Sequence, residues 1–272
     1  MKIYTVHLTE DYPFLKNGGA DPTLQVYLQV QGLDVRRPAM VVLPGGGYTH
    51  LCLREGEPIA LEFMADGANG FVLNYSVKPC AYPQQLLEVA AAFDYIKTHA
   101  EELCVNPQKI AVLGFSAGGH LAASYCTMLH REEIAKHLNP TPAAASVLCY
   151  PVISGVCKPH RGSIAVLAGK EDFTEAEASW LSCEKYVTSD TPPAYIWTTG
   201  DDNAVPPINS LKYAEALIDH GVPVELHLFP SGPHGQASSK FGTFDGAGSP
   251  QSKYNEQWVG EARVWLRRQF HY

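Results

Sequence analysis

Clustered positive charge is scarce in this sequence. Lys and Arg number 20 against 28 Asp and Glu, so the formal net charge is −8 at pH 7. The adjacent basic pairs are limited to Arg36-Arg37 and Arg267-Arg268. A protein that binds the phosphate backbone needs a clustered basic surface. The composition therefore predicts no nucleic-acid partner, and both basic pairs are interpreted as solvated surface.

Long apolar runs are also missing. No segment approaches the roughly 18 consecutive apolar residues that span a bilayer. The N-terminal stretch MKIYTVHLTEDYPFL has no apolar run of signal-peptide length. We therefore expect a cytoplasmic protein with no membrane partner. The sequence leaves open whether the chain forms a homo-oligomer.

Paired cysteines are the third absence. The chain has 7 cysteines, an odd number, and they are spread singly with no C-x-x-C pair. This spacing favours neither a zinc site nor a disulfide framework. We expect reduced thiols that pack as small apolar side chains.

What the sequence does contain is an alternation of apolar runs and helix-like stretches. The apolar runs predict buried strands at 39–43, 70–75, 110–115, 145–150, 194–199 and 224–229. Apolar residues at helical spacing predict helices at 57–68, 84–104, 117–130 and 209–220, with a closing helix at 255–270. Segments 2–8 and 24–30 are expected to form antiparallel edge strands.

This order of elements predicts an α/β fold. Continuous apolar strands separated by helices indicate a mostly parallel central sheet with helices on both faces. We expect a single domain over residues 1–272. The interval 155–193 is too long for a simple connection between a helix and a strand, so it predicts a lid-like insertion over one end of the sheet.

The motif GFSAG, residues 114–118, places Ser116 between a predicted strand and a predicted helix. It fits the pattern G-x-S-x-G, in which a sharp strand-to-helix turn lifts a serine hydroxyl above the sheet. Such a turn needs small neighbours. The motif alone is compatible with an ordinary turn, but its position between strand and helix favours a nucleophile.

A nucleophilic serine needs a histidine base and an acid that orients the base, and in this architecture they follow in the order serine, acid, histidine. Asp201 and Asp202 follow the strand at 194–199, and His234 follows the strand at 224–229. Both positions lie at the carboxyl ends of strands, where α/β sites form. His120 shares the serine's helix but precedes the acids, so a structural hydrogen bond is favoured for it.

The segment PGGGY, residues 44–48, follows the strand at 39–43. Its glycines allow backbone N–H groups to approach a developing negative oxygen, together with the N–H of Ala117. A glycine-rich turn and a phosphate cradle are the alternatives. No Gly-Lys-Ser/Thr follows, which argues against the nucleotide site. We predict an oxyanion hole formed by Gly46, Gly47 and Ala117.

These motifs resemble the α/β-hydrolase superfamily, in particular small bacterial esterases of the acetyl-xylan-esterase-like and dienelactone-hydrolase-like group. The stretches that carry the resemblance include VVLPGGGY, VNPQKIAVLGFSAGGHLAASY, TPPAYIWTTGDDNAVPPINSLKYAEAL and GVPVELHLFPSGPHG, and they cover most of residues 39–235. The family's D-x-x-V-P pattern matches at residues 202–206, which selects Asp202 as the acid. Pro44 stands where the oxyanion loop usually has a histidine, so the family pattern does not say what braces the loop here.

The resemblance implies a serine esterase that works through an acyl-serine intermediate. Ser116, Asp202 and His234 are expected to be catalytic, without a metal or an organic cofactor. The expected substrate is a small-molecule ester with a short acyl group, and an imported acetylated oligosaccharide fits a cytoplasmic enzyme. A peptidase or amidase, a general lipase-type carboxylesterase and a non-catalytic binding protein on the same scaffold are the alternatives.

The substrate pocket is expected between strand ends and the insertion. We predict that it is lined by Tyr48, Tyr75, Tyr82, Pro151 and Trp180. The segment REGEP, residues 54–58, offers Arg54 and Glu55 as further site residues. Pro at a helix start instead favours N-terminal capping and dipole compensation by Glu55 and its neighbour Glu57.

Overall fold

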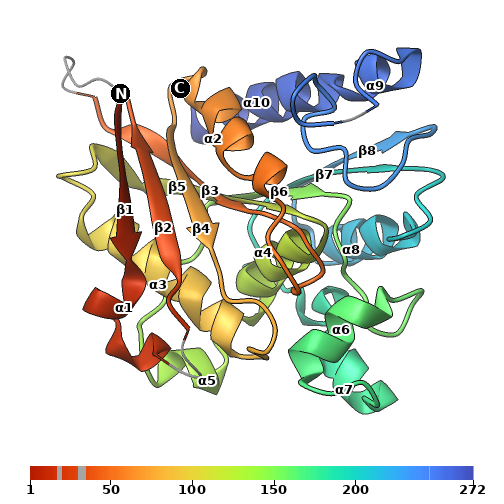
Figure 1. Cartoon of the computed structure of the whole chain (residues 1–272), viewed down its shortest axis with the longest axis horizontal. Coiled ribbons are helices and arrows are strands. Elements are labelled where there is room, and N and C mark those ends of the chain that lie inside the picture. The colour runs from red at the N-terminus through yellow and green to blue at the C-terminus, as the bar shows by residue number, and fades with distance from the viewer. Residues whose placement is uncertain (17–19, 30–34, 245, 272) are drawn as a thin grey trace.

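One sheet organises the chain in the computed structural model, which describes residues 1–16, 20–29, 35–244 and 246–271 (Figure 1). Its eight strands lie in the order β1-β2-β4-β3-β5-β6-β7-β8. Their bounds are β1 (Lys2–His7), β2 (Thr23–Leu28), β3 (Arg37–Leu43), β4 (Asn69–Asn74), β5 (Val105–Phe115), β6 (Ala145–Cys149), β7 (Ala194–Thr199) and β8 (Val224–Phe229).

Strands β1 and β2 pair antiparallel with each other and β2 with β4, whereas the other neighbouring pairs are parallel. The predicted fold class is therefore confirmed, with its antiparallel opening strands. Residue 30, the last of the strand expected at 24–30, lies outside the described residues.

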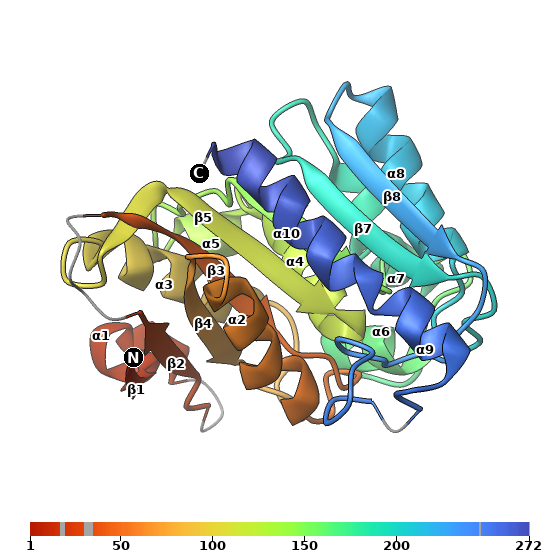
Figure 2. The same cartoon turned by 90° about the horizontal axis from the view of Figure 1, so that it is seen from above.

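Helices cover both faces of the sheet, as Figure 2 shows. Helices α3 (Gln84–Thr98), α4 (Ser116–Met128) and α8 (Ile208–Asp219) pack into one apolar cluster, and α2 (Glu57–Met64) and α10 (Gln257–Phe270) pack into the other. The shorter elements are α1 (Leu8–Asp11), η1 (Pro13–Leu15), η2 (Leu53–Glu55), α5 (Glu132–Ala135), α6 (Arg161–Ala168), α7 (Glu175–Trp180), η3 (Cys183–Tyr186) and α9 (Pro250–Asn255). Because both faces are covered, the central strands are apolar on both sides.

Two helix predictions need correction. The helix expected at 84–104 ends at Thr98, because the chain turns before β5 and Cys104 takes a left-handed φ of 51° that no α-helix continues through. The helix expected at 57–68 ends at Met64, before the turn to β4, whereas the closing helix expected at 255–270 is present as α10. Local apolar spacing cannot detect either early end, since apolar residues continue beyond both.

The segment 155–193 contains α6, α7 and η3, and α6 and α7 lie side by side (Figure 1). Hydrogen bonds join it to the rest of the molecule: Asn209 Nδ2 donates to the carbonyl of Lys158 at 3.2 Å, and the Ser146 N–H donates to the carbonyl of Pro193 at 2.9 Å. The segment is thus anchored at both ends. That it acts as a lid stays a prediction.

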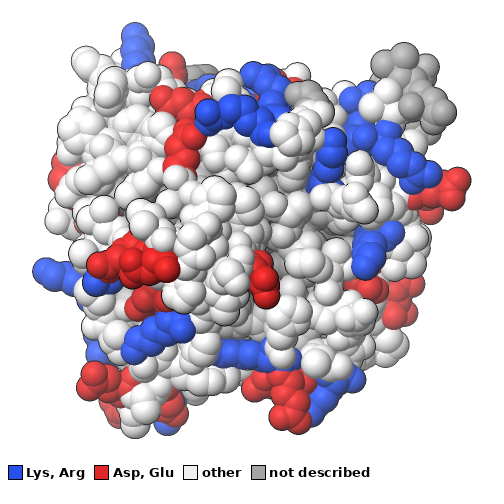
Figure 3. All heavy atoms as spheres, turned by 180° about the vertical axis from the view of Figure 1, so that it is seen from behind, with Lys and Arg blue, Asp and Glu red and all other residues white. Residues whose placement is uncertain are grey.

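No helix within the described ranges combines the length and apolar character needed to cross a membrane. On the face shown in Figure 3, Lys and Arg side chains lie next to Asp and Glu in several places, and uncharged residues cover the wide areas between these groups. The structure also contains ion pairs, for example Lys240 with Glu62 at 2.7 Å.

Candidate active site

Ser116 is the first residue of α4 and follows directly on β5. Its φ of 52° lies in the left-handed region, which is uncommon for a residue with a side chain. A Cβ at Gly114 would lie 2.1 Å from the carbonyl oxygen of Gly118, and a Cβ at Gly118 would lie 2.2 Å from that of Leu43. The turn is therefore closed to any residue but glycine at these two positions, and the strand-to-helix turn predicted from GFSAG is present.

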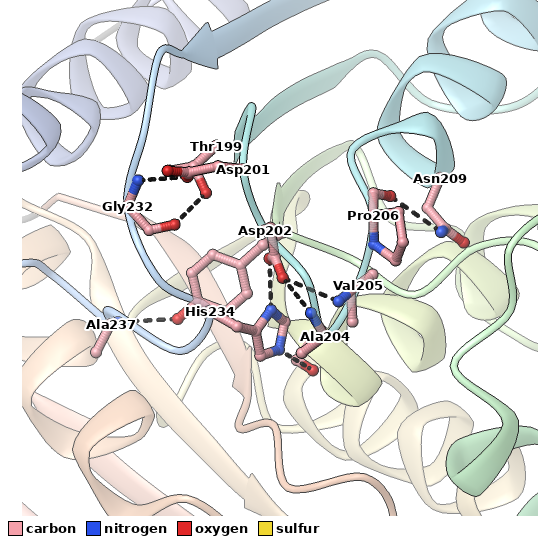
Figure 4. A network of polar contacts seen from close by, with 12 residues as sticks. Thr199, Asp201, Asp202, Ala204, Val205, Pro206, Asn209, Gly232, His234 and Ala237 are labelled. Carbon is pink, nitrogen blue, oxygen red and sulfur yellow. Dashed lines mark hydrogen bonds and ion pairs between the residues drawn. The ribbon is translucent and has the colours of Figure 1, made fainter.

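Ser116, His234 and Asp202 form a continuous hydrogen-bonded chain, and Figure 4 shows how its members His234 and Asp202 face each other. His234 Nε2 lies 2.7 Å from Ser116 Oγ, and His234 Nδ1 lies 2.6 Å from Asp202 Oδ2. A carboxylate only accepts hydrogen bonds, so Nδ1 carries the proton and Nε2 is left to accept from the serine hydroxyl. In this tautomer the imidazole is ready to take a proton from Ser116.

The two neighbouring aspartates have different partners. Asp202 is 3% exposed, and its Oδ1 accepts from the N–H groups of Ala204 and Val205, each at 2.9 Å, which leaves Oδ2 for the histidine. Asp201 instead accepts from the Gly232 N–H at 2.7 Å. Asp202 therefore orients the imidazole, while Asp201 anchors the loop on which the histidine is carried (Figure 4).

The sheet order explains how residues so distant in the chain meet. Strands β3 and β5 are neighbours, with Leu43 opposite Gly114, so the PGGGY loop and the serine turn leave the sheet side by side. Strands β7 and β8 are also neighbours, with Thr199 opposite Phe229, which brings the acid and base loops together. All four strands run parallel, so the four loops lie at one edge of the sheet.

Gly46 and Gly47 lie beside the serine with φ of 127° and 64°. The N–H of the preceding Gly45 is already used, since it donates to Glu55 Oε2 at 2.8 Å. Ala117 is the second residue of α4, where N–H groups have no partner within the helix. The backbone of this region can thus offer donors from two sides to a negative oxygen formed at the serine.

A cavity of about 360 Å³ opens over the serine. It is lined by Gly46, Gly47, Thr49, His50, Cys52, Arg54, Glu55, Ser116, His160, His234 and Gly235. Its volume suits a small ligand. The loop after β3 supplies most of the wall.

Sequence reasoning missed Thr49, His50, Cys52, His160 and Gly235 as cavity residues. His160 stands at the N-cap of α6, where its ring accepts from the Ser163 N–H at 3.3 Å, but histidine is not among the residues that usually signal a cap. Burial, together with the nearby His234, lowers the pKa of His160 below its usual range. The ring is therefore neutral at pH 7. Nothing in the sequence indicates that α6 starts beside the serine.

The predicted pocket residues Tyr48 and Tyr75 lie behind the oxyanion loop. Tyr48 is fully buried, and its hydroxyl lies 2.9 Å from His120 Nδ1. Tyr75 donates to the carbonyl of Pro44 at 2.6 Å. Both side chains support the loop and the helix beneath it, and neither is among the residues that line the cavity in the described part of the chain.

The other three predicted pocket residues also have partners elsewhere. The rings of Tyr82 and Trp180 meet at a centroid distance of 4.5 Å, and the Arg131 guanidinium lies 3.9 Å from the Trp180 ring. Pro151 packs against Gly119, where an added Cβ would be 2.8 Å from it. Among the described residues the cavity wall includes none of these three.

His120 has the structural role favoured from the sequence. Its Nε2 donates to the carbonyl of Leu181 at 2.8 Å, and its Nδ1 accepts from the Tyr48 hydroxyl. Burial lowers the pKa of His120 to about 4. The neutral ring thus connects α4 to the 155–193 segment.

The capping role predicted for Glu55 is wrong. Helix α2 begins at Glu57 after Gly56, with Pro58 in its first turn, and the cap has no side-chain hydrogen bond. Glu55 ends the preceding η2 turn, which directs its carboxylate inward, and the side chain is 2% exposed. The alternative is confirmed, since Arg54 and Glu55 both line the cavity.

The fold and this arrangement of serine, histidine and aspartate define an α/β-hydrolase. The family model BD-FAE matches residues 24–217, so the chain belongs to the BD-FAE family. Among curated relatives, "Endo-1,4-beta-xylanase B" of Butyrivibrio fibrisolvens is 35% identical over 83% of this chain and 36% of its own length. "Acetylxylan esterase" of Xylanibacter ruminicola is 32% identical over 84% of this chain and 45% of its own. The chain thus spans less than half the length of these two relatives.

Solved structures match along almost the whole chain. An acetyl ester-xyloside bifunctional hydrolase from Caldicellulosiruptor lactoaceticus is similar with a TM-score of 0.83 and 34% identity, covering 97% of this chain and 96% of that one. A carboxylesterase from Lactobacillus plantarum WCFS1 gives a TM-score of 0.84 and 32% identity, covering 99% and 98%. The likeness therefore includes the segment 155–193.

Proposed function

We propose that this protein is a serine esterase that hydrolyses short-chain esters, acetyl esters of carbohydrates foremost, through an acyl-serine intermediate. The observation that carries the proposal is the chain of hydrogen bonds from Ser116 through His234 to Asp202 at the floor of a small cavity. The names of the acetylxylan esterase and the acetyl ester-xyloside hydrolase support the acetylated carbohydrate as substrate.

In the proposed reaction, Ser116 Oγ attacks the ester carbonyl carbon while its proton passes to His234 Nε2. The carbonyl oxygen becomes an oxyanion that accepts from the N–H groups of Gly46, Gly47 and Ala117. Asp202 stabilises the imidazolium. The bond to the alcohol then breaks, and His234 gives its proton to the leaving oxygen.

A water molecule repeats the cycle on the acyl-serine. His234 takes a proton from the water as it attacks, and the carboxylic acid leaves with Ser116 restored. The original Ser116 proton thus leaves with the alcohol and a water proton replaces it, so Ser116 and His234 end each cycle in their starting states.

The cytoplasm is the proposed location of the protein. Cell fractionation with an antibody to the chain tests this location.

The decisive experiment is labelling with a fluorophosphonate probe, which reacts with activated serines. We expect stoichiometric labelling of the native protein at Ser116 and none in Ser116→Ala. A native protein that stays unlabelled would refute the enzyme and favour a binding protein on this scaffold. Faster turnover of aminoacyl p-nitroanilides than of p-nitrophenyl acetate would favour an amidase.

Acyl length and alcohol identity need a second panel. We expect kcat/KM to be highest for acetyl esters and to fall with chain length, since the cavity holds only about 360 Å³. Release of acetate from acetylated xylo-oligosaccharides tests the carbohydrate. Turnover restricted to acyl chains of about eight carbons or more would instead indicate a lipase-type carboxylesterase.

A further inference from the structure

Pro44 stands at the position where the oxyanion loop usually has a histidine, and buried side chains hold the loop's backbone instead. The carbonyl of Pro44 accepts from Tyr75, and the N–H of Gly45 donates to Glu55 Oε2. The carbonyl of Gly45 in turn accepts from the Cys52 N–H at 2.9 Å. The two peptide units before Gly46 are therefore fixed, and with them the direction in which the next N–H groups point.

The second oxygen of the Glu55 carboxylate reaches the other half of the site. Its Oε1 accepts from the Tyr150 hydroxyl at 2.8 Å, and that hydroxyl accepts from the Ala237 N–H at 2.8 Å. The Tyr150 ring also packs edge-on against His234, with the ring centroids 4.8 Å apart. Figure 4 shows the Ala237 contact beside the imidazole. One carboxylate thus connects the oxyanion loop to the loop that holds the base.

A buried carboxylate is costly unless its oxygens are satisfied. Burial raises the pKa of Glu55, while the hydrogen bonds from Tyr150 and Gly45 and the nearby His234 oppose that rise. A Cβ at Gly45 would lie 2.7 Å from Glu55 Oε2 and 3.1 Å from the Ser116 Cβ. The Glu55 carboxylate therefore packs directly behind Gly45, and Gly45 in turn lies next to Ser116.

We propose that Glu55 is a positioning residue that fixes the oxyanion donors relative to the base. It touches no reacting atom and acts through Gly45 on one side and through Tyr150 on the other. The inference rests on the esterase function proposed above. In this proposal, Glu55 and Tyr150 together brace the loop in place of the histidine that usually does so.

The test compares Glu55→Ala, Glu55→Gln and Tyr150→Phe with the matched control Glu57→Gln, which changes an exposed carboxylate two residues away. For p-nitrophenyl acetate we expect Glu55→Ala to lower kcat about 100-fold, comparable to losing one oxyanion donor. KM should stay within about threefold, because ground-state binding does not use the donors. Glu57→Gln should match the native enzyme.

The conservative variants separate positioning from folding. In Glu55→Gln the amide oxygen still accepts from Gly45 and the amide N–H₂ can donate to Tyr150, so we expect kcat to recover to within about tenfold of native. Tyr150→Phe keeps the Gly45 bond and should lose about tenfold. Affinity for methylboronic acid, which forms a tetrahedral adduct on serine, should fall in parallel with kcat in all three variants.

Circular dichroism reports the folded fraction of each variant. Native kcat per folded molecule in Glu55→Ala would overturn the inference, as would a kcat loss without loss of boronic acid affinity. If Glu55→Ala does not fold, native kcat in both Glu55→Gln and Tyr150→Phe overturns it. A native protein without turnover would refute the proposed function and this inference together, whereas native kcat in Glu55→Ala would refute only the inference.

Discussion

His120 and His234 each use both ring nitrogens in hydrogen bonds, yet their surroundings are opposite. The first is 2% exposed and lies between Tyr48 and a backbone carbonyl. The second has a side chain 21% exposed to the cavity, between a carboxylate and a hydroxyl. A carbonyl and a phenol hold a neutral ring in place, whereas a carboxylate stabilises the cation that forms when the ring takes a proton. The partners, rather than the residue type, separate a structural histidine from a base.

The largest expected effect comes from removing the imidazole at the cavity. His234→Ala should lower kcat for p-nitrophenyl acetate by about 10⁴-fold or more, because the serine then lacks its base. Steady-state kinetics measure the loss, and denaturant unfolding should show little change in stability. His120→Gln is the control and should keep kcat within about threefold. Equal losses of kcat in His234→Ala and His120→Gln would contradict the distinction between a catalytic and a structural histidine.

The two aspartates sharpen the same contrast on the acid side. Asp202→Asn should lower kcat about 10⁴-fold, because an amide facing Nδ1 favours the wrong imidazole tautomer. Asp201→Asn keeps an acceptor for the Gly232 N–H and should lose no more than about tenfold. Kinetics across pH 6 to 9 check both variants. A larger loss of kcat in Asp201→Asn than in Asp202→Asn would indicate that Asp201, and not Asp202, orients the imidazole.

The pH dependence of stability tests His120. Its pKa is about 4 in the folded protein and about 6.5 when unfolded, so the unfolded chain binds the extra proton between these values. The neutral His120 ring therefore contributes on the order of 3 kcal/mol to the free energy of unfolding. This contribution is fully present above pH 6.5 and is lost as the pH falls to 4. Denaturant unfolding should therefore show a shallower pH slope in His120→Gln. Parallel slopes would contradict the neutral buried ring.

The smallest effect is expected at Trp180. Its ring stacks on Arg131 outside the cavity wall, so Trp180→Ala should cost about 1 kcal/mol of stability and leave kcat/KM for short esters within about twofold. Thermal unfolding and steady-state kinetics provide the two numbers. A rise in KM of tenfold for acetylated oligosaccharides, with no change for p-nitrophenyl acetate, would return Trp180 to substrate binding.

The fold and the residues Ser116, Asp202 and His234 could be predicted because the sequence patterns that indicate them are local. Most central strands contain a short apolar run, and Ser116, Asp202 and His234 each follow a strand. Parallel strands then bring these positions to one edge. The family pattern was still needed to choose Asp202, since both aspartates follow β7 and only hydrogen bonds distinguish them.

The cavity wall was not predictable in the same way. Glu55 is seven residues from Tyr48, which was expected to face the substrate, but η2 turns the Glu55 carboxylate inward. Tyr82 and Trp180 were plausible sugar-stacking residues, and their meeting with Arg131 depends on how α5 and the 155–193 segment pack. Such contacts are set by tertiary packing, which single-residue patterns do not encode.

Helix α4 begins at Ser116 and runs for 13 residues away from the cavity. Its aligned peptide dipoles place a partial positive charge at the serine end. In the proposed reaction, a field of this sign favours the oxyanion that forms during acylation, and it also attracts the carboxylate released at the end of each cycle. We therefore expect this partial positive charge both to lower the barrier to acylation and to slow the release of the carboxylate product.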